Sequence, residues 1–473
     1  MLRSEPLGTI VPLSKKNWQF SSSCSRELKK TLAPDQDKVI GSFPNFKNLH
    51  FSLNREEPMS LVRKFIVSLL RLKEVFVVDY EFKRRDRALH LWVRPYKTGC
   101  RCPQCERRCT ILHVCASPRM WRDMPVCGWS VFFCYHPKEV FCPTHGRIQE
   151  RIPWADPYAR ITYRFEYALL VYCQLMTQKA AARLLHISKS TLSDLLHQSI
   201  TRLRDGHRIR GLTSIGVDEI SYCKGHKYAT IVYDLDRSCV VWVGQGKGRE
   251  TIDIFFQESL SRYQRDQILW AACDMSDAYI GAIKEYCRKA TLVLDRFHIV
   301  KAINAALDEV RKEEWREASG QERKILKGLR WLLFKHSSTR SKKDSRILHA
   351  LRKGNRRIYR AWLLKDEFEQ FWDFKAPWAA ERFLTRWTTA ALRTRLEPMR
   401  KLVNTLRKHS SHIISFIESR LTNAAAEGLN RIIKIVKNRA SGFRTLDAFT
   451  DMIFLIVGDV DIPAQIPAKF RAL

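Results

Sequence analysis

The amino-acid sequence predicts an α+β protein built from several domains. Three observations support this. Residues 59–155 combine short alternating apolar segments with a cluster of cysteines, and residues 156–208 carry apolar side chains at helical spacing. From Thr213 the pattern changes to apolar strands that alternate with helices, and a long helical region follows. At 473 residues the chain has room for about three domains with sizeable cores.

Basic residues strongly outnumber acidic ones. Lys and Arg total 83 against 49 Asp and Glu, a formal net charge of +34. Such an excess would repel a compact fold unless a polyanion binds it, and nucleic acid is the usual polyanion. An anionic membrane is the rival, but the sequence shows no amphipathic anchor, no apolar run of ~18 residues and no signal peptide. We therefore expect a cytoplasmic protein that binds DNA and no membrane.

Residues 1–58 are polar and show no clear period, so we expect a loosely ordered extension before the first domain. The next segment, from Ser60 to Leu72, has helical spacing. Residues 75–80 and 88–93 then alternate apolar and polar side chains as two strands do. The domain that they begin is expected to end near residue 155.

Two short metal-ligand patterns lie within the cysteine cluster. Cys102 and Cys105 form a C-x2-C pair, and after 36 intervening residues Cys142 and His145 form a C-x2-H pair. Thiolates and imidazole suit zinc, and two such pairs on separate loops can surround one ion as a tetrahedron. We therefore predict a structural Zn²⁺ in a zinc-ribbon-like module.

Alternatives to this ligand set remain open. Eight of the 14 cysteines lie between Cys100 and Cys142, and in a reducing compartment such clustering favours metal over disulfides. Cys100 and Cys109 compete with the four chosen ligands, and a cysteine-rich core without metal is the alternative. Residues 130–134 and 139–141 are predicted to be the strands that support the metal site.

A helix-turn-helix is predicted within residues 156–208. The first of its two helices carries apolar residues up to Leu185, residues 186–188 form the turn, and Ser188 or Ser190 caps the second helix. The second helix of this motif enters the major groove of DNA. The side chains that it would turn toward the groove are Lys189, Ser190, Thr191 and Ser193. The high positive charge supports this interpretation.

Residues 209–304 show strands and helices in the order β-β-β-α-β-α-β-α. Strands are predicted at 214–217, 228–233, 239–243, 268–273 and 291–294, and helices at 251–263 and 280–288, with another after residue 298. This order fits a ribonuclease-H-like mixed sheet.

Residues 305–412 have helical patterning almost throughout and form an insertion between two parts of this core. Basic runs within the insertion, such as residues 352–357, are expected to follow DNA phosphates. The core is expected to resume at residues 413–473.

A helix within this last segment has a single carboxylate on a basic, polar face. Its apolar face is formed by Leu429, Ile432, Ile433 and Val436. Glu427 lies on the other side, together with Arg431 and Lys434, which are candidate DNA contacts. Taken alone, Glu427 and Arg431 could be a surface ion pair that contributes about 0.3–0.5 kcal/mol.

Two aspartates upstream give Glu427 a different meaning. Asp218 and Asp274 each end an apolar strand, and carboxylates at neighbouring strand ends can approach within a few Å. Without a cation they would repel and raise each other's pKa, a conflict that Mg²⁺ or Mn²⁺ removes. With Glu427 as a third ligand, two ions about 3.5–4 Å apart could be held, the arrangement that serves phosphodiester chemistry.

Three other carboxylates compete with these three acids, and one of them, Asp295, is accompanied by His298. Glu219 follows Asp218 directly and therefore points to the opposite face of a strand. Asp277 lies three residues past its strand and is expected to cap a helix. Asp295 and His298 could bind metal or orient a base, but Asp295 could equally cap the next helix.

Four segments resemble the catalytic blocks of bacterial insertion-sequence transposases of the ISL-three family. They read GVDEISYCKGHKYATIVYD, CDMSDAYIGAI, LDRFHIVKAIN and TNAAAEGLNRIIKIVKNRASGFRTLDAF, and the similarity runs from about Phe65 to Val460. The family has an Asp-Asp-Glu triad on a ribonuclease-H-like fold. The resemblance thus implies Asp218, Asp274 and Glu427 as the triad.

Two further features belong to the resemblance. Asp295 and His298 match a family motif and are auxiliary candidates, and His145 stands where many members have Cys. The resemblance implies that the zinc module and the helix-turn-helix recognise terminal inverted repeats. Two Mg²⁺ or Mn²⁺ ions at the triad would then free a 3′-hydroxyl that attacks target DNA. Such transposases act as homodimers or larger assemblies on DNA in the bacterial cytoplasm, associated with the nucleoid.

Two alternatives stand beside this prediction. A non-catalytic DNA-binding regulator needs only the zinc module and the helix-turn-helix. A structure-selective nuclease would share the triad but would not join strands.

Overall fold

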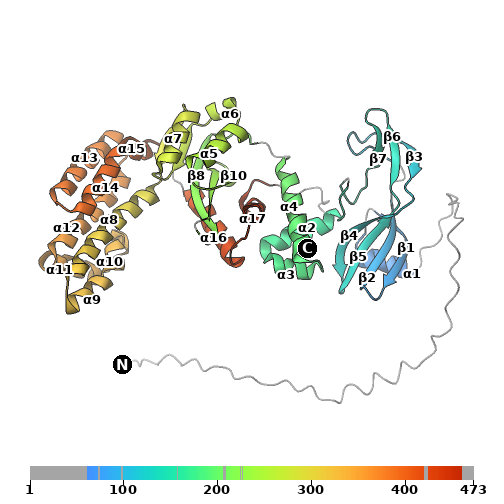
Figure 1. Ribbon diagram of the computed structural model, residues 1–473, viewed down its shortest axis with the longest axis horizontal. Helices are drawn as coiled ribbons and strands as arrows, with labels where there is room; N and C mark the ends of the chain where they lie inside the picture. Colours follow the sequence, from blue (N-terminus) through green and yellow to red (C-terminus); the bar gives the residue numbers. More distant parts are fainter. Residues whose placement is uncertain are drawn as a thin grey trace, which may run out of the picture. The chain divides into compact units, whose positions relative to one another are not determined.

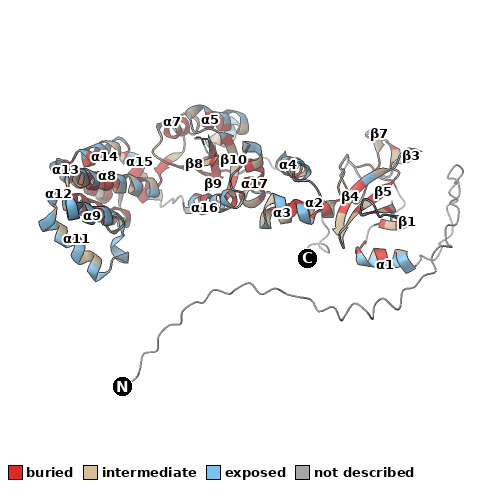
Figure 2. Ribbon diagram, turned by 60° about the horizontal axis from the view of Figure 1, so that its bottom comes forward, coloured by how far each residue is buried: buried red, intermediate tan, exposed pale blue. Residues whose placement is uncertain are grey.

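The computed structural model describes residues 61–72, 75–96, 100–156, 158–205, 209–223, 225, 227–419 and 424–460. The extension expected at residues 1–58 lies outside this described part. None of the helices within it is long and apolar enough to cross a membrane. Figure 1 labels the elements, and Figure 2 shows how far their residues are buried.

A four-stranded sheet follows the first helix, α1 (Leu61–Leu69). Its strands are β1 (Val75–Lys83), β2 (Ala88–Pro95), β4 (Arg119–Val126) and β5 (Trp129–Tyr135), in the order β1-β2-β5-β4. The strands predicted at 75–80 and 88–93 are confirmed as β1 and β2. Trp121 on β4 is fully buried against Trp154, with the ring centroids 5.8 Å apart. Burial of a large side chain such as Trp121 contributes about 2–3 kcal/mol.

A second, three-stranded sheet carries the cysteine pairs. It consists of β3 (Thr110–Val114), β6 (Lys138–Cys142) and β7 (Gly146–Gln149), in the order β3-β6-β7. The strand predicted at 139–141 is β6. The prediction that residues 130–134 support the metal site is wrong, because they belong to β5. β5 pairs with β2 and β4, and its side chains Val131 and Phe133 are buried in the same core as Trp121.

Three helices form the next region: α2 (Tyr163–Leu175), α3 (Gln178–Leu184) and α4 (Lys189–Asp205). The predicted helix-turn-helix corresponds to α3 and α4. Leu185 and Leu192 are fully buried between the helices. His186 between them has a φ of 54°, which turns the chain sharply. Ser188 is the cap, because its Oγ accepts from the Thr191 N–H at 3.0 Å.

A five-stranded mixed sheet follows. Its strands are β8 (Ser214–Cys223), β9 (Lys227–Asp234), β10 (Cys239–Gln245), β11 (Trp270–Cys273) and β12 (Thr291–Leu294), in the order β10-β9-β8-β11-β12. The first three are antiparallel, and β11 and β12 run parallel to β8. The succession of strands predicted along the chain, three strands followed by two that alternate with helices, is confirmed. The first strand does not end at Asp218, because its pairing with β9 continues beyond Ile220.

Helices cover both faces of this sheet. On one face lie α5 (Arg249–Ile254), the π-helical turn η1 (Phe255–Ser259), α6 (Arg262–Asp266) and α7 (Asp277–Tyr286). On the other lie α16 (Ala424–Arg439) and α17 (Leu446–Val457), which share a core with α2 and α4. The single helix predicted at 251–263 is wrong. The chain widens into a π-turn, and Leu260 is extended before Ser261 caps α6.

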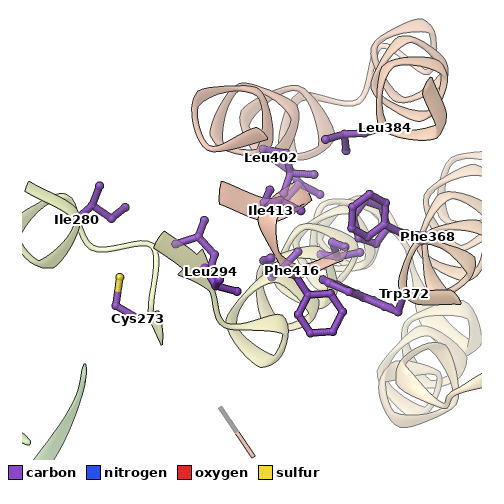
Figure 3. Close-up of a cluster of buried hydrophobic side chains, with 14 of the residues drawn as sticks. Cys273, Ile280, Leu294, Phe368, Trp372, Leu384, Leu402, Ile413 and Phe416 are labelled. Atoms are coloured by element: carbon purple, nitrogen blue, oxygen red, sulfur yellow. The ribbon is translucent and has the colours of Figure 1, made fainter. Parts of the chain in front are cut away.

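The helical region between the two parts of this core comprises α8 (Arg296–Glu317), α9 (Gly320–Gly328), α10 (Arg330–Phe334), η2 (Ser337–Thr339), α11 (Lys342–Gly354), α12 (Arg356–Phe368), η3 (Glu369–Asp373), α13 (Pro377–Arg393), α14 (Glu397–Lys408) and α15 (Ser410–Ser419). α8 is continuous across residue 305. α15 packs against β12, so Ile413 and Phe416 join one apolar core with Leu294 and with Trp372 (Figure 3).

α16 is amphipathic, but its apolar face differs from the prediction. Leu429, Ile433 and Val436 are buried, whereas Ile432 is 41 % exposed. The prediction that Ile432 belongs to the apolar face is wrong, because Asn430 occupies part of the buried face of the helix. Three of the four side chains predicted for the apolar face are therefore buried, and one, Ile432, is exposed.

Candidate active site and metal-binding module

Strand pairing brings three aspartates to adjacent positions. In the parallel pair of β11 with β8, the register places Asp274 beside Asp218, two residues beyond the last paired positions. In the parallel pair of β12 with β11, it places Asp295 beside Asp274. The Asp295 N–H donates to the carbonyl of Cys273 at 3.0 Å, which extends this pairing by one residue. Three carboxylates therefore follow one line across β8, β11 and β12.

Asp218 is half-buried, and protein donors hold both of its oxygens. Oδ1 accepts from the Glu219 N–H at 2.7 Å, and Oδ2 accepts from Asn430 Nδ2 at 2.6 Å. Burial raises the pKa of Asp218, and the charges of Asp274 and Asp295 raise it further, although the Glu219 N–H and His298 oppose this. A carboxyl perturbed by two other carboxylates lies close to both.

Backbone N–H groups hold the other two aspartates. Asp274 Oδ1 accepts from the Ser276 N–H, and Asp295 Oδ1 accepts from the Phe297 N–H, both at 3.0 Å. Asp295 thereby caps α8, as one of the two alternatives predicted. Its Oδ2 lies 3.8 Å from Nε2 of His298, and its side chain is almost fully buried. Asp295 therefore caps a helix and is also the third carboxylate in the line across the sheet.

Glu427 approaches the same cluster from α16. It is exposed, yet its pKa is raised, first by partial burial and then by the charge of Asp295. Asp218 raises the pKa of Glu427 as well, and His298 lowers it. Strand register thus brings Asp218, Asp274 and Asp295 together, with His298 beside Asp295, and the hydrogen bond from Asn430 to Asp218 brings α16, which carries Glu427, beside β8. Segments far apart in the sequence supply these residues.

The donor set of this acidic cluster fits a hard divalent cation. Four carboxylates offer only oxygen ligands, which Mg²⁺ and Mn²⁺ prefer, and a cation would relieve their repulsion. No three of them have ligand oxygens within 4.8 Å of one another, and among the described residues only a Cys/His group meets that distance. The ligand oxygens of the acidic cluster are therefore farther apart than the ligand atoms of the Cys/His group.

That Cys/His group consists of Cys102, Cys105, Cys142 and His145. Nδ1 of His145 lies 3.5 Å from Sγ of Cys102 and 3.7 Å from Sγ of Cys142, and the Sγ atoms of Cys105 and Cys142 are 3.6 Å apart. Zinc bonds of about 2.3 Å to sulfur and 2.0–2.1 Å to nitrogen place tetrahedral ligands roughly 3.5–3.8 Å apart. The group can therefore hold a metal ion of that size.

The local backbone favours ionised ligands in this group. Burial alone would raise the pKa of Cys142. Hydrogen bonds from the backbone N–H groups of Thr144 and His145, and from the His145 ring, lower it to about 6. A thiol with that pKa is largely a thiolate at neutral pH, which is the form that binds metal.

The competing cysteines have other partners. Cys100 donates its thiol hydrogen to Glu150 at 3.2 Å, and its pKa is raised to about 11 by burial and by this carboxylate. Cys109 donates its thiol hydrogen to the carbonyl of Arg107 at 3.4 Å, but it adjoins the group, because burial raises its pKa and the charge of Cys142 raises it further. Neither joins the Cys/His group.

The helix-turn-helix presents three of its four predicted contacts to solvent. Lys189, Ser190 and Thr191 are exposed at the start of α4. Ser193 is half-buried and donates to Gln178 Oε1 at 3.3 Å, so its hydroxyl joins α4 to α3. The predicted contacts on α16, Arg431 and Lys434, are also exposed.

Comparison with protein families decides the class of the chain. A model of ISL3 transposases, described as "Transposase", matches residues 215–453, just over half of the 473 residues. A second, described as "Helix-turn-helix domain of transposase family ISL3", matches residues 150–200. This chain belongs to the ISL3 family of transposases. The second match includes α3 and most of α4, so the helix-turn-helix of this ISL3 transposase is its DNA-binding element.

Two similar proteins cover most of the chain. The transposase for insertion sequence element IS1557 of Mycobacterium tuberculosis is 28% identical over 427 residues, which are 84% of this chain and 96% of the relative. The transposase for insertion sequence element IS1001 of Bordetella parapertussis is 28% identical over 370 residues, 77% of this chain and 90% of the relative.

The two remaining acidic competitors in this ISL3 transposase differ in their distance from the cluster. Val217 faces the core under α5 and α7, so strand alternation turns Glu219 to that side as well, away from α16. Glu219 nevertheless borders the cluster, because burial raises its pKa and the charges of Asp274 and Asp218 raise it further, against Lys247 and His298. Asp277 begins α7, and both of its oxygens accept from Lys408 Nζ at 2.7 Å. Asp277 is therefore an exposed ion-pair partner of α14.

One residue of the site was missed in the sequence. Asn430 on α16 is only 7 % exposed, and it links Asp218 to the hydroxyl of Tyr233 on β9. Its sequence signal is a polar residue at a position where the helical period demands an apolar one, one turn after Glu427.

Proposed function

We propose that this chain is a DNA transposase that cuts and joins strands at the acidic cluster, with Asp218, Asp274 and Glu427 as its catalytic triad. The family assignment supports transposition. The single observation that most supports the triad is the hydrogen bond from Asn430 Nδ2 to Asp218 Oδ2 at 2.6 Å, which joins α16, one turn after Glu427, to the strand that carries Asp218. The strand order β10-β9-β8-β11-β12 supports a ribonuclease-H-like core.

The triad would hold two Mg²⁺ or Mn²⁺ ions, with Asp295 and His298 as auxiliary groups. Bound there, such ions would activate the attacking oxygen and stabilise the leaving oxygen. The protein itself contributes carboxylates that are already oriented, because backbone N–H groups and Asn430 donate hydrogen bonds to the aspartates. The exposed cations on α16 would hold the phosphates of the bound strand.

The proposed reaction consists of two substitutions at phosphorus. In the first, the oxygen of water bonds to a phosphorus at the end of the element. The bond from that phosphorus to the 3′-oxygen breaks, and this oxygen takes up a proton, through solvent, in place of the one that water loses, so a 3′-hydroxyl is freed. In the second, the 3′-hydroxyl loses its proton and its oxygen bonds to a phosphorus of target DNA, whose own 3′-oxygen leaves and takes up a proton. Neither step links DNA to the protein, so no Ser, Tyr or Cys nucleophile is required.

We also propose that Cys102, Cys105, Cys142 and His145 hold a structural Zn²⁺. The module and the helix-turn-helix would together bind the terminal inverted repeats of the element. Two such ends must be brought together for transposition, so a homodimer or a larger assembly on DNA is the expected active form.

Cleavage of end DNA tests this proposal. The substrate is a duplex that contains the inverted repeat flanking the gene, incubated with the full chain in Mg²⁺. We expect Mg²⁺-dependent release of a 3′-hydroxyl at the element's end, and joining of precut ends to a target plasmid. Binding without cleavage would instead support the non-catalytic regulator. Cleavage without joining would support a nuclease.

The start of α4 is predicted to contact the inverted repeat. Lys189→Glu should weaken binding of end DNA about tenfold or more at low salt, because it replaces a phosphate-neutralising cation by a repelling anion. Equilibrium binding measures this. Arg288→Glu is the matched control, an exposed charge reversal beyond α7. An equal loss in both variants would show a general charge effect and would remove Lys189 from the binding surface.

A second predicted DNA contact lies in the helical region. Along α11, Lys342, Arg346 and Lys353 follow one another at helical spacing opposite the buried Leu348, and none of the three forms an ion pair within the described part of the chain. Arg346→Gln should reduce the slope of log K against log [salt] by about 0.9, the value of one phosphate contact.

The matched control for this prediction is Arg357→Gln on α12. Arg357 belongs to the basic run 352–357 and is exposed, but it is already paired with Glu313 at 3.0 Å and Glu314 at 2.8 Å, so we exclude it from the residues of that run expected to follow DNA phosphates. Its loss should leave the salt slope unchanged. Equal slopes for the two variants and the unmodified chain would exclude α11 from the DNA interface.

A further inference from the structure

Asn430 occupies a position that is unusual for an amide. It lies on the buried face of α16 beside Leu429 and Ile433, and only 7 % of it is exposed. A buried amide must satisfy both its oxygen and its nitrogen. Asn430 does so with two partners from the sheet, Tyr233 and Asp218.

The orientation of the amide follows from its partners. An ionised carboxylate can only accept hydrogen bonds, so Nδ2 of Asn430 donates to Oδ2 of Asp218 at 2.6 Å. Oδ1 of Asn430 then faces Tyr233, whose hydroxyl donates to it. Tyr233 is fully buried on β9, so the far end of this chain of hydrogen bonds is anchored in the core.

These contacts connect two acids of the cluster. Asn430 lies one helical turn after Glu427, on the same helix, and it is bonded directly to Asp218 on β8. The Glu219 N–H holds the other oxygen of Asp218 at 2.7 Å. These two hydrogen bonds therefore fix the orientation of the Asp218 carboxylate. The bond from Asn430 also sets the distance between α16 and β8 close to Glu427.

We propose that Asn430 is a positioning residue, which acts through Asp218 to hold that carboxylate and Glu427 in the arrangement that binds the divalent cation. The inference rests on the proposed function of the acidic cluster. Residues that orient metal ligands typically contribute 10- to 100-fold to metal affinity.

The chain provides a matched control for this role. Lys437, also on α16, donates to the carbonyl of Ser221 on β8 at 2.7 Å. Both side chains thus join the same helix to the same strand, but Lys437 touches no acid of the cluster. If Asn430 merely docked the helix, loss of either link would have the same effect.

The experiment compares Asn430→Ala, Tyr233→Phe and Lys437→Ala in the full chain. Mn²⁺ binding is measured from the disappearance of the electron paramagnetic resonance signal of the free ion, alongside thermal unfolding and cleavage of end DNA. We expect Asn430→Ala to weaken Mn²⁺ binding at least 10-fold, and raised metal to restore part of its cleavage. Tyr233→Phe, which keeps the ring volume, should weaken binding by a smaller factor. Lys437→Ala should bind Mn²⁺ as the unmodified chain does.

Two results would overturn this inference without affecting the proposed function. The first is an unchanged Mn²⁺ affinity in folded Asn430→Ala, or in Tyr233→Phe if Asn430→Ala does not fold. The second is a loss of Mn²⁺ affinity in Lys437→Ala equal to that in Asn430→Ala. An unmodified chain that neither binds Mn²⁺ nor cleaves end DNA would overturn the proposed function, and this inference with it.

Discussion

Replacing Asp218, Asp274 or Glu427 by alanine is expected to reduce cleavage of end DNA by roughly 10³-fold or more, while binding of that DNA stays within about twofold. When several residues act together as one catalytic unit, loss of any one of them removes most of the activity. The loss arises because each acid supplies ligands that the other two cannot replace. End binding survives because the helix-turn-helix lies on α3 and α4, outside the acidic cluster. Gel-based cleavage and binding assays on one substrate measure both quantities.

Asp277→Asn is the matched control for these variants. Asp277 lies close to Asp274 in the sequence, but its carboxylate is exposed and paired with Lys408. Its cleavage should equal that of the unmodified chain. Retained cleavage in any one of the three alanine variants would remove that residue from the proposed triad.

Replacing Cys102 or Cys142 by serine is expected to abolish metal binding by the Cys/His group and to unfold the three-stranded sheet. Structural zinc in small modules contributes about 10–16 kcal/mol of apparent binding free energy, and that energy is folding energy. The short strands β3, β6 and β7 offer little core to replace it, since all five residues of β3 are exposed. Elemental analysis should show one Zn²⁺ per unmodified chain and none in either variant.

Cys100→Ser and Cys109→Ser serve as controls for the metal site. Both residues lie in the same cluster, but they bond to Glu150 and to the Arg107 carbonyl. Both variants should retain the ion. Full metal content in Cys102→Ser, or its loss in Cys109→Ser, would show that the ligand set is wrongly assigned.

The positions of the strands could largely be predicted from the sequence, because buried strands give apolar runs of characteristic length. The runs that end at Cys273 and Leu294 are buried over their last three residues, and each is followed by an aspartate on the line across the sheet. The two cysteine pairs were equally visible, because metal ligands keep short fixed spacings.

The remaining errors come from contacts that local patterns do not encode. The helix predicted at 251–263 breaks at a π-turn where Phe255 and Phe256 both enter the core, which one helical face does not allow. The apolar pattern of residues 130–134 correctly indicated a strand, but it does not indicate which of the two sheets this strand joins. Asn430 was missed because its partner Asp218 lies 212 positions away in the sequence.

Anomalous diffraction from Mn²⁺ bound to the chain in complex with end DNA tests the central claim most directly. We predict anomalous peaks bounded by the carboxylates of Asp218, Asp274 and Glu427, at about 2.0–2.2 Å from their oxygens, the range typical of a small hard cation. Mn²⁺ bound elsewhere, or a Glu427 turned away from both aspartates, would contradict the proposal that these three acids form one catalytic site.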